Sequence, residues 1–467
     1  MRRLVIDRCS EPHALQPFVL NAEGGTEPLV NLYLSGSRFR GYAVGTQKKY
    51  ALSMAMWLTF CDVKGKSWRS AEPDDVADFK FWRMSDPGNV DRVVGSTFHA
   101  DLAAIDSFYD WVAPRYGISS PIVRSEKRRV RNEFVGGVAK AEPAGVRDRD
   151  VKWLDPKAVA RWIDMGLRGL SEDGRENAES RNRVGARDAA YAQLLYGSGL
   201  RAQEGGSLLL AELPPEHVQS RFHRLVLAAA CAKGKRGRRF WLDRAGLDET
   251  RIYIEGQRAE AVARAQAERR YEKCPDLLIA LGPPMDRRLP VRWKGKSEGL
   301  RLDSLGPSER MRLFFETDRG LEPAMVWLNE DGRPRPFQSW NSTFAAANKR
   351  LTRAGYEWFT CTPHMLRHSF ALRWYAVARL LWDRRLGHLT EDEQHDFREQ
   401  FGDTWQFVQT LLGHRHPQTT ANIYLEPFQS CEVDILLECA AAAPVSALIE
   451  SIFESDRRVV HDPVEVR

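Results

Sequence analysis

The stretch Gly197-Ser198-Gly199-Leu200-Arg201-Ala202-Gln203-Glu204 lies near the middle of a chain of 467 residues. The apolar segment 189–195 before it has the character of a helix, and the glycines predict a turn at the end of that helix. Arg201 follows this turn, so its backbone can approach a ligand closely. Glu204 lies one helical turn after Arg201, and the two side chains can form an i,i+3 ion pair.

A β-hairpin with a basic tip is predicted just downstream. Residues 225–230 are apolar and residues 240–242 read Phe-Trp-Leu, whereas the segment between them is rich in Lys, Arg and Gly. Such a tip is usually a solvated turn, but its cations can also contact phosphates. The residues that could do so are Lys233, Lys235, Arg236 and Arg238.

Two further motifs lie towards the C-terminus. The first is Thr362-Pro363-His364-Met365-Leu366-Arg367-His368, in which Arg367 follows His364 by three residues and shares one helical face with it. The second is Leu412-Gly413-His414, and Tyr424 follows ten residues after its histidine. Each motif alone also fits a surface pair or a packed helix. Only the occurrence of all the motifs in this order indicates a shared function.

These residues together suit the chemistry of a phosphodiester. Displacement at phosphorus places negative charge on the non-bridging, attacking and leaving oxygens, and without a metal the protein must supply the stabilising charges. Arginine stays protonated and can grip two oxygens with its planar guanidinium. A phenol has a reference pKa near ~10, so Tyr424 needs neighbours to act as a nucleophile at neutral pH. No metal-ligand motif accompanies these residues. Together they predict attack by a tyrosine on a nucleic-acid backbone.

The motif block between residues 197 and 428 resembles that of the tyrosine recombinases, the phage-type integrases that exchange DNA strands at specific sites. The resemblance implies an enzyme that needs neither a metal nor ATP, because a covalent 3′-phosphotyrosine stores the energy of the backbone bond. It also implies a role for each matching residue: Arg201 and Arg367 bind the scissile phosphate, Lys233 is the general acid for the 5′-oxygen, His364 assists proton removal from the tyrosine, His414 donates a hydrogen bond to the phosphate, Tyr424 is the nucleophile and Glu204 is the supporting acidic residue.

Two of these assignments have competitors in the chain. A second Leu-Gly-His ends at His388, but the residues nine and ten positions later are Phe397 and Arg398, so no nucleophile follows it and His414 is preferred. This choice implies an insertion near 379–408. On the hairpin, Ala232 stands where the family's Gly-Lys-Gly pattern has its first glycine, so Lys235 remains an alternative to Lys233.

The expected fold is mainly α with a small β-sheet (α+β), and combines an N-terminal helical core-binding domain with a C-terminal tyrosine-recombinase catalytic domain. Helical patterns run through 44–60, 73–84, 95–113, 254–270, 338–353 and 363–381. The rest of 244–325 reads as loop-rich. The expected layout is an irregular segment 1–27, the core-binding domain 28–118, a basic linker 119–152, the catalytic domain 153–430 with insertions near 244–325 and 379–408, and a C-terminal helix and tail 431–467.

Composition is compatible with double-stranded DNA as the partner. The formal net charge is +6, the seven cysteines form no CxxC pair, and no stretch approaches the ~20 apolar residues of a membrane span. These features favour a cytoplasmic, nucleoid-associated protein with reduced thiols and no membrane partner. Further candidates for DNA contact are Lys48, Lys49, Arg128 and Arg129.

The family resemblance further implies a homo-tetramer on two paired DNA sites, with accessory DNA-bending or directionality proteins as possible partners. The length of the chain favours integration or excision of a mobile element. Two alternatives share part of the sequence evidence: a type IB topoisomerase, which relaxes supercoils with similar chemistry, and a catalytically silent DNA-binding regulator.

Overall fold

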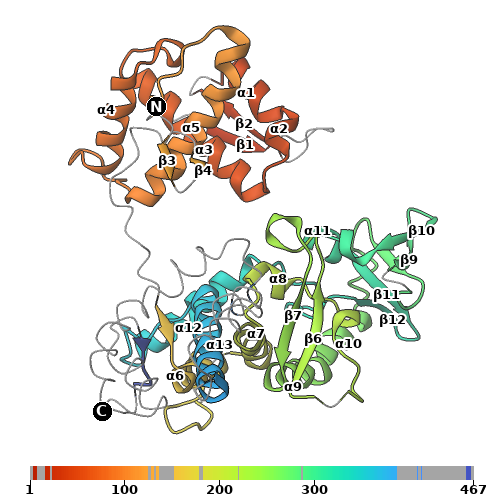
Figure 1. The fold of residues 1–467 in the computed structure, drawn as a ribbon. Coiled ribbons are helices and arrows are strands. Elements are labelled where there is room, and N and C mark those ends of the chain that lie inside the picture. Colours follow the sequence, from red (N-terminus) through yellow and green to blue (C-terminus); the bar gives the residue numbers. More distant parts are fainter. Residues whose placement is uncertain are drawn as a thin grey trace, which may run out of the picture. The chain divides into compact units, whose positions relative to one another are not determined.

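A computed structural model describes residues 4–7, 16–21, 24–124, 128–130, 133–135, 152–177, 182–218, 220–285, 288–386, 408, 412 and 459–463. The chain divides into two compact units, Met1–Asp148 and Arg149–Arg467. Helices dominate both units and the sheets are small, which confirms the predicted α+β fold class (Figure 1). No helix within the described ranges is long and apolar enough to cross a membrane.

The first unit is a helical bundle with two short antiparallel strand pairs, β1–β2 and β3–β4. Its helices are α1 (Pro28–Ser35), α2 (Ser37–Arg40), α3 (Val44–Val63), α4 (Pro73–Met84) and α5 (Gly95–Tyr116), and its strands are β1 (Leu4–Asp7), β2 (Pro17–Leu20), β3 (Arg128–Val130) and β4 (Glu133–Val135). The helices predicted at 44–60, 73–84 and 95–113 are confirmed. Helix α4 starts where predicted because Pro73 occupies its first turn and Asp75 accepts a hydrogen bond from the Glu72 N–H at 2.8 Å.

The segment 1–27 differs from the expected irregular chain, because β1 and β2 pair antiparallel. A side chain from α1 holds this pair in place. Asn31 accepts a hydrogen bond from the Val19 N–H at 2.8 Å and donates one to the Val19 carbonyl at 2.9 Å. Because these contacts cross twelve residues of chain, local sequence patterns did not reveal them.

The helical body of the second unit centres on α7 (Gly185–Ser198), which packs against α9 (Arg244–Tyr253), the π-helical segment Trp162–Arg168 and α13 (Pro363–Leu386). Its other elements are β5 (Trp153–Leu154), α6 (Pro156–Arg161), α8 (Ala202–Gly206), the π-helical segment Ile254–Arg258, α10 (Ala259–Ala267), α11 (Pro307–Arg310), α12 (Ser339–Arg353) and β13 (Val459–Val460). The predicted helices at 338–353 and 363–381 are confirmed.

The helix predicted at 254–270 begins ten residues earlier, at Arg244. Asp243 caps its N-terminus by accepting a hydrogen bond from the Gly246 N–H at 2.9 Å. Helical geometry then continues through the π-helical segment into α10. The expected start was late because Asp243 also ends a strand, and its capping role depends on where that strand stops.

A hairpin and a larger sheet lie together on one side of α7, α12 and α13 (Figure 1). The predicted basic hairpin is confirmed as the antiparallel pair β6 (Phe222–Leu227) and β7 (Arg238–Asp243). A five-stranded sheet in the order β10-β9-β8-β11-β12 replaces the loops expected after residue 277. Its strands are β8 (Leu278–Ala280), β9 (Arg288–Trp293), β10 (Lys296–Arg301), β11 (Leu313–Thr317) and β12 (Gly320–Pro323). They are short and interrupted by Pro and Gly, and only their pairing with one another makes the sheet recognisable.

Candidate active site

Arg201 lies where α7 gives way to α8. Gly199 ends α7 in the left-handed region, with φ +63°, and its N–H bonds the Leu195 carbonyl at 2.9 Å. A side chain at this position would collide with the ring of Phe370, so the turn requires glycine both for its dihedral and for its space. Arg201 then adopts an extended conformation as the N-cap of α8.

Buried contacts fix α8 against the core of the second unit. The Tyr191 hydroxyl donates to the Ala202 carbonyl at 2.9 Å, and the Trp327 indole N–H donates to the Gly205 carbonyl at 2.8 Å. Tyr191 in turn stacks on Trp340, with the ring centroids 3.6 Å apart. The position of Arg201 is therefore set by a rigid aromatic core rather than by its own short helix.

Glu204 forms the centre of a network of arginines. Its carboxylate accepts hydrogen bonds from the Arg201 backbone N–H and from Arg201 Nη1, both at 3.0 Å. Arg238 on β7 donates to the same carboxylate with two nitrogens, at 3.0 and 2.7 Å. Glu204 is only 1% exposed, and burial by itself would raise its pKa. The guanidiniums of Arg238 and Arg367 and the Arg201 N–H outweigh burial and lower that pKa to about 2.

Arg367 connects three distant parts of the chain. From α13 it donates to the Gly199 carbonyl, two residues before Arg201, and to the Leu412 carbonyl at 2.6 Å. Both Arg367 and Leu412 are almost fully buried. Arg367 therefore contacts the glycine turn that precedes Arg201, and the first residue of Leu412-Gly413-His414 is bonded to Arg367.

The predicted site residue His364 lies beside a second histidine, His368, that was not among the predicted site residues. His364 is exposed, while His368 lies one helical turn later and is buried. The two rings meet edge to face, with their centroids 4.3 Å apart. The i,i+4 spacing of the two histidines was the sequence signal that could have pointed to this contact.

Lys233 and Lys235 lie on a tight turn at the hairpin tip. The turn is not regular helix, because Gly234 and Lys235 both have positive φ, of 76° and 54°. Lys233, Lys235 and Arg236 are exposed, so the tip presents its cations to solvent. Gln203 of α8 donates to the Cys231 carbonyl at 3.1 Å, which ties the base of this turn to the helix that carries Arg201.

Arg238 occupies a different environment from the rest of the hairpin tip. Its side chain is 15% exposed and is paired with Glu204. Strand β7 alternates, so Arg238, Phe240 and Leu242 face inward while Arg239 and Trp241 face outward. This period of two was the signal that could have separated Arg238 from the exposed cations. The pair with Glu204 supports an internal role for Arg238 rather than the expected DNA contact.

The remaining predicted residues lie elsewhere or outside the described part of the chain. Lys48 and Lys49 belong to α3 of the first unit, where Lys48 is exposed and Lys49 pairs with the buried Asp101 at 2.7 Å. Arg128 and Arg129 lie on β3. The side chains of Arg128 and Arg129, together with His388, His414, Tyr424 and the tail helix expected at 431–453, fall outside the described residues. Within the described ranges, no three His, Cys, Asp or Glu side chains are arranged to hold a metal ion.

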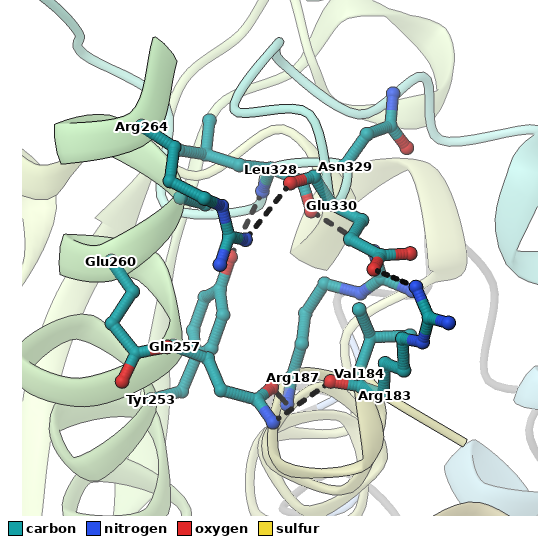
Figure 2. Close-up of a pocket in the computed structure, with 11 residues that line it drawn as sticks. Arg183, Val184, Arg187, Tyr253, Gln257, Glu260, Arg264, Leu328, Asn329 and Glu330 are labelled. Carbon is teal, nitrogen blue, oxygen red and sulfur yellow. Dashed lines mark hydrogen bonds and ion pairs between the residues drawn. The ribbon is translucent and has the colours of Figure 1, made fainter. Parts of the chain in front are cut away.

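Figure 2 shows a separate pocket between α7, the helical run 253–264 and the loop 328–330. Its polar groups bond one another. Arg187 donates to the Leu328 carbonyl at 3.0 Å, Arg264 donates to the Glu330 carbonyl at 3.2 Å, and Tyr253 accepts from the Leu328 N–H at 3.0 Å. None of the candidate catalytic residues lines it, and its contacts hold the loop against the helices.

Comparison with known proteins gives a limited result. No family model and no curated protein matches the chain. Among solved structures, it is similar to the XerH site-specific recombinase bound to a palindromic difH substrate, with 14% identity over 88% of this chain and 85% of that one and a TM-score of 0.46. It is similar to the Tn1549 transposon integrase in complex with circular intermediate DNA, with 14% identity, 87% and 98% coverage and a TM-score of 0.46. For the XerA recombinase the values are 14%, 89%, 100% and 0.32. These three structures are of two recombinases and an integrase.

Proposed function

We propose that this chain is a site-specific DNA recombinase of the tyrosine recombinase class, and that it cleaves and rejoins DNA through a covalent 3′-phosphotyrosine at Tyr424. The observation that carries the proposal is the pair of contacts made by Arg367, to the Gly199 carbonyl and to the Leu412 carbonyl. They join three motifs, of which the second lies 168 residues after the first and the third lies 45 residues after the second. A separate structural role for each motif, such as a surface pair or a packed helix, does not explain why all three motifs contact one arginine.

In this proposal His414, which follows Leu412 by two residues in the sequence, acts at the same site as Arg201 and Arg367. A guanidinium has five N–H donors, so an arginine that holds carbonyls or a carboxylate can also bind phosphate oxygens.

The proposed reaction is a displacement at phosphorus. The Tyr424 oxygen loses its proton with the assistance of His364 and forms a bond to the phosphorus, while the bond from phosphorus to the 5′-oxygen breaks. Lys233 gives a proton to the leaving 5′-oxygen, and Arg201, Arg367 and His414 stabilise charge on the non-bridging oxygens. Attack by the 5′-hydroxyl of another strand reverses these steps and releases the tyrosine. Bond energy is conserved, so strand exchange needs no ATP.

Glu204 supports this site by holding its arginines in place. Because its pKa is lowered to about 2, its carboxylate is ionised at neutral pH and fixes the guanidiniums of Arg201 and Arg238. Pre-positioned charges stabilise a transition state without the cost of reorganising at the moment of reaction. We further propose that the enzyme acts in the cytoplasm as a tetramer on two paired DNA sites and integrates or excises a mobile element, with accessory DNA-bending or directionality proteins where the reaction requires them.

A nicked suicide substrate tests the proposal. Such DNA traps the covalent intermediate, because the short 5′-strand diffuses away after cleavage. The wild-type protein should form an adduct that survives denaturing electrophoresis, and Tyr424→Phe should form none. Tyr116→Phe, which changes an exposed tyrosine of α5, should behave as wild type. Arg201→Gln should slow adduct formation by about 10²–10³-fold, the usual effect of losing one stabilising donor.

Three outcomes would overturn the proposal. The absence of an adduct from the wild-type protein on its cognate site would leave a DNA-binding regulator as the better reading. An adduct formed by Tyr424→Phe would place the nucleophile elsewhere. Processive relaxation of a supercoiled plasmid that carries no specific site would indicate a type IB topoisomerase instead.

A further inference from the structure

The hairpin β9–β10 forms one edge of the five-stranded sheet and has two different faces. Leu289 and Val291 point into an apolar core and are almost fully buried. Arg288, Pro290 and Arg292 alternate with them and are exposed. Helix α10 packs on the β12 side of the sheet, at the opposite edge. The outer face of β9–β10 thus remains open while its inner face anchors it.

This outer face carries a concentration of positive charge. Residues 288–301 contain five basic side chains and a single acidic one, Glu298. Arg288, Arg292 and Arg301 lie on the outer face, whereas Lys296 is opposite Trp293 on the other face and Lys294 lies in the turn. Arg288 and Arg301 are directly opposite each other in the antiparallel register. Like charges in this relation repel, so the pair weakens the sheet unless an anion binds between or beside them.

Neighbouring acids neutralise only part of this charge. Arg292 pairs with Glu316 at 3.1 Å, and Lys294 lies 3.8 Å from Asp276. Among the residues that the structure describes, no acidic side chain forms an ion pair with Arg288, Lys296 or Arg301. The hairpin therefore keeps a net positive face.

The turn of the hairpin fixes the direction in which these cations project. Lys294 and Gly295 both have positive φ, of 48° and 77°, as in the two-residue turns that join tightly paired strands. Asparagine and glycine are the residues that suit the first of these positions, whereas lysine tolerates it poorly. Lys294 also lies over the ring of Trp293, with its nitrogen 4.9 Å from the ring centroid. The turn places a lysine where backbone preference alone would not.

The end of β10 lies next to the hairpin tip that carries Lys233. The turn that follows Arg301 packs directly on the segment before Lys233, since the Ala230 N–H donates to the Asp303 carbonyl at 3.0 Å. The Cys231 thiol also contacts the Leu305 carbonyl, at 3.5 Å. The β6–β7 tip and the end of β10 are therefore neighbours within the second unit.

We propose that the outer face of β9–β10 binds the phosphate backbone of DNA beyond the phosphate that is cleaved, through Arg288 and Arg301. This inference rests on the proposed function, because it extends the surface that begins at Lys233. Backbone contacts of this kind displace counterions and strengthen binding without reading the base sequence. The face therefore sets affinity and position on the DNA, and takes no part in the chemical step.

Binding measurements with Arg288→Gln/Arg301→Gln, made in the Tyr424→Phe protein, test the proposal. The control is Lys349→Gln/Arg353→Gln, which removes the same charge from the exposed side of α12. For a duplex that contains the recombination site, the hairpin variant should bind about tenfold or more weakly near 0.1 M salt. The slope of log affinity against log salt should fall by about 1–2 for the two lost contacts. The control should change neither quantity by a comparable amount.

Adduct formation separates this proposal from the proposed function. With Tyr424 present and protein in saturating excess, the hairpin variant should form the covalent adduct at the wild-type rate, which also shows that it folds. An unchanged affinity and salt slope would overturn the proposal, and so would an equal loss in the control, which would indicate only bulk charge. Failure of the wild-type protein to form any adduct would instead count against the proposed function.

Discussion

Replacing Arg238 with methionine should destabilise the second unit by removing the main partner of a buried carboxylate. Glu204 is 1% exposed and would lose two hydrogen bonds, of 3.0 and 2.7 Å, while keeping the Arg201 side chain and backbone N–H. Methionine fills similar space, so the change isolates the charge and the hydrogen bonds. The pKa of Glu204 should rise, because burial would then be less well compensated.

The magnitude follows from the pKa. A fall from 4.5 to about 2 corresponds to about 3 kcal/mol of stabilisation, at about 1.4 kcal/mol for each tenfold change. Breaking a buried ion pair by removing one partner typically costs about 3–5 kcal/mol. Since Arg201 remains, we expect the free energy of unfolding at pH 7 to fall by roughly 2–3 kcal/mol.

The effect should depend on pH in a defined direction. A carboxyl whose folded pKa is lowered stabilises the fold above its unfolded pKa, near 4.5, and this contribution is lost as pH falls towards 2. The difference between wild type and Arg238→Met should therefore be full at pH 7 and shrink below pH 4.5. Calorimetry across this range measures it, because the two units of the chain can unfold in separate transitions.

Arg239→Met is the matched control, since the adjacent side chain on β7 is exposed and should cost no more than about 0.5 kcal/mol. A double-mutant cycle with Glu204→Gln should give a coupling energy of about 1–3 kcal/mol between the two positions. If Arg238→Met unfolds with the wild-type free energy at pH 7, or if the coupling is zero, the carboxylate does not depend on Arg238 and the reasoning is wrong.

Two further predictions concern the turn before Arg201 and the thiols. Gly199→Ala should lower the free energy of unfolding by more than about 2 kcal/mol, because φ is positive at this position and the new methyl group would meet Phe370. Gly256→Ala is the control and should be neutral or stabilising, because the added carbon has open space there. Calorimetry compares the two variants, and equal effects would contradict the steric explanation. Cys231 should resist thiol-specific labelling in the folded protein, because it is buried and burial raises its pKa to about 11. The half-buried Cys274 should react faster. Mass spectrometry follows the labelling of both thiols, and rapid labelling of Cys231 would contradict the prediction.

Local patterns predicted the helical elements well. The boundaries of α4 were read correctly because a proline and a capping acid lie within a few residues of its start. The β6–β7 hairpin and the turn at Gly199 were likewise predictable, because both depend on residues that are close together in the sequence. The ion pair of Arg201 with Glu204 is present at 3.0 Å, as the i,i+3 spacing allowed.

Patterns failed where pairing crosses long stretches of chain. The five-stranded sheet was read as loops, because β8 has only three residues and its neighbours along the chain do not reveal that it pairs with β11. Arg238 was grouped with the exposed cations of the hairpin tip, because nothing in the sequence indicated that it pairs with Glu204. Tyr424 and His414 remain predictions from the sequence.

The sequence by itself determined the residue types that could act on a phosphate and the helices and turns that carry them, since these depend on interactions a few residues long. Only the tertiary structure decided which of those residues meet. Arg367 reaches the Gly199 carbonyl across 168 residues, and Arg238 reaches Glu204 across 34. The physical reason is that these charges are held by burial and by partners from other elements, and both arise only when the core around α7 closes.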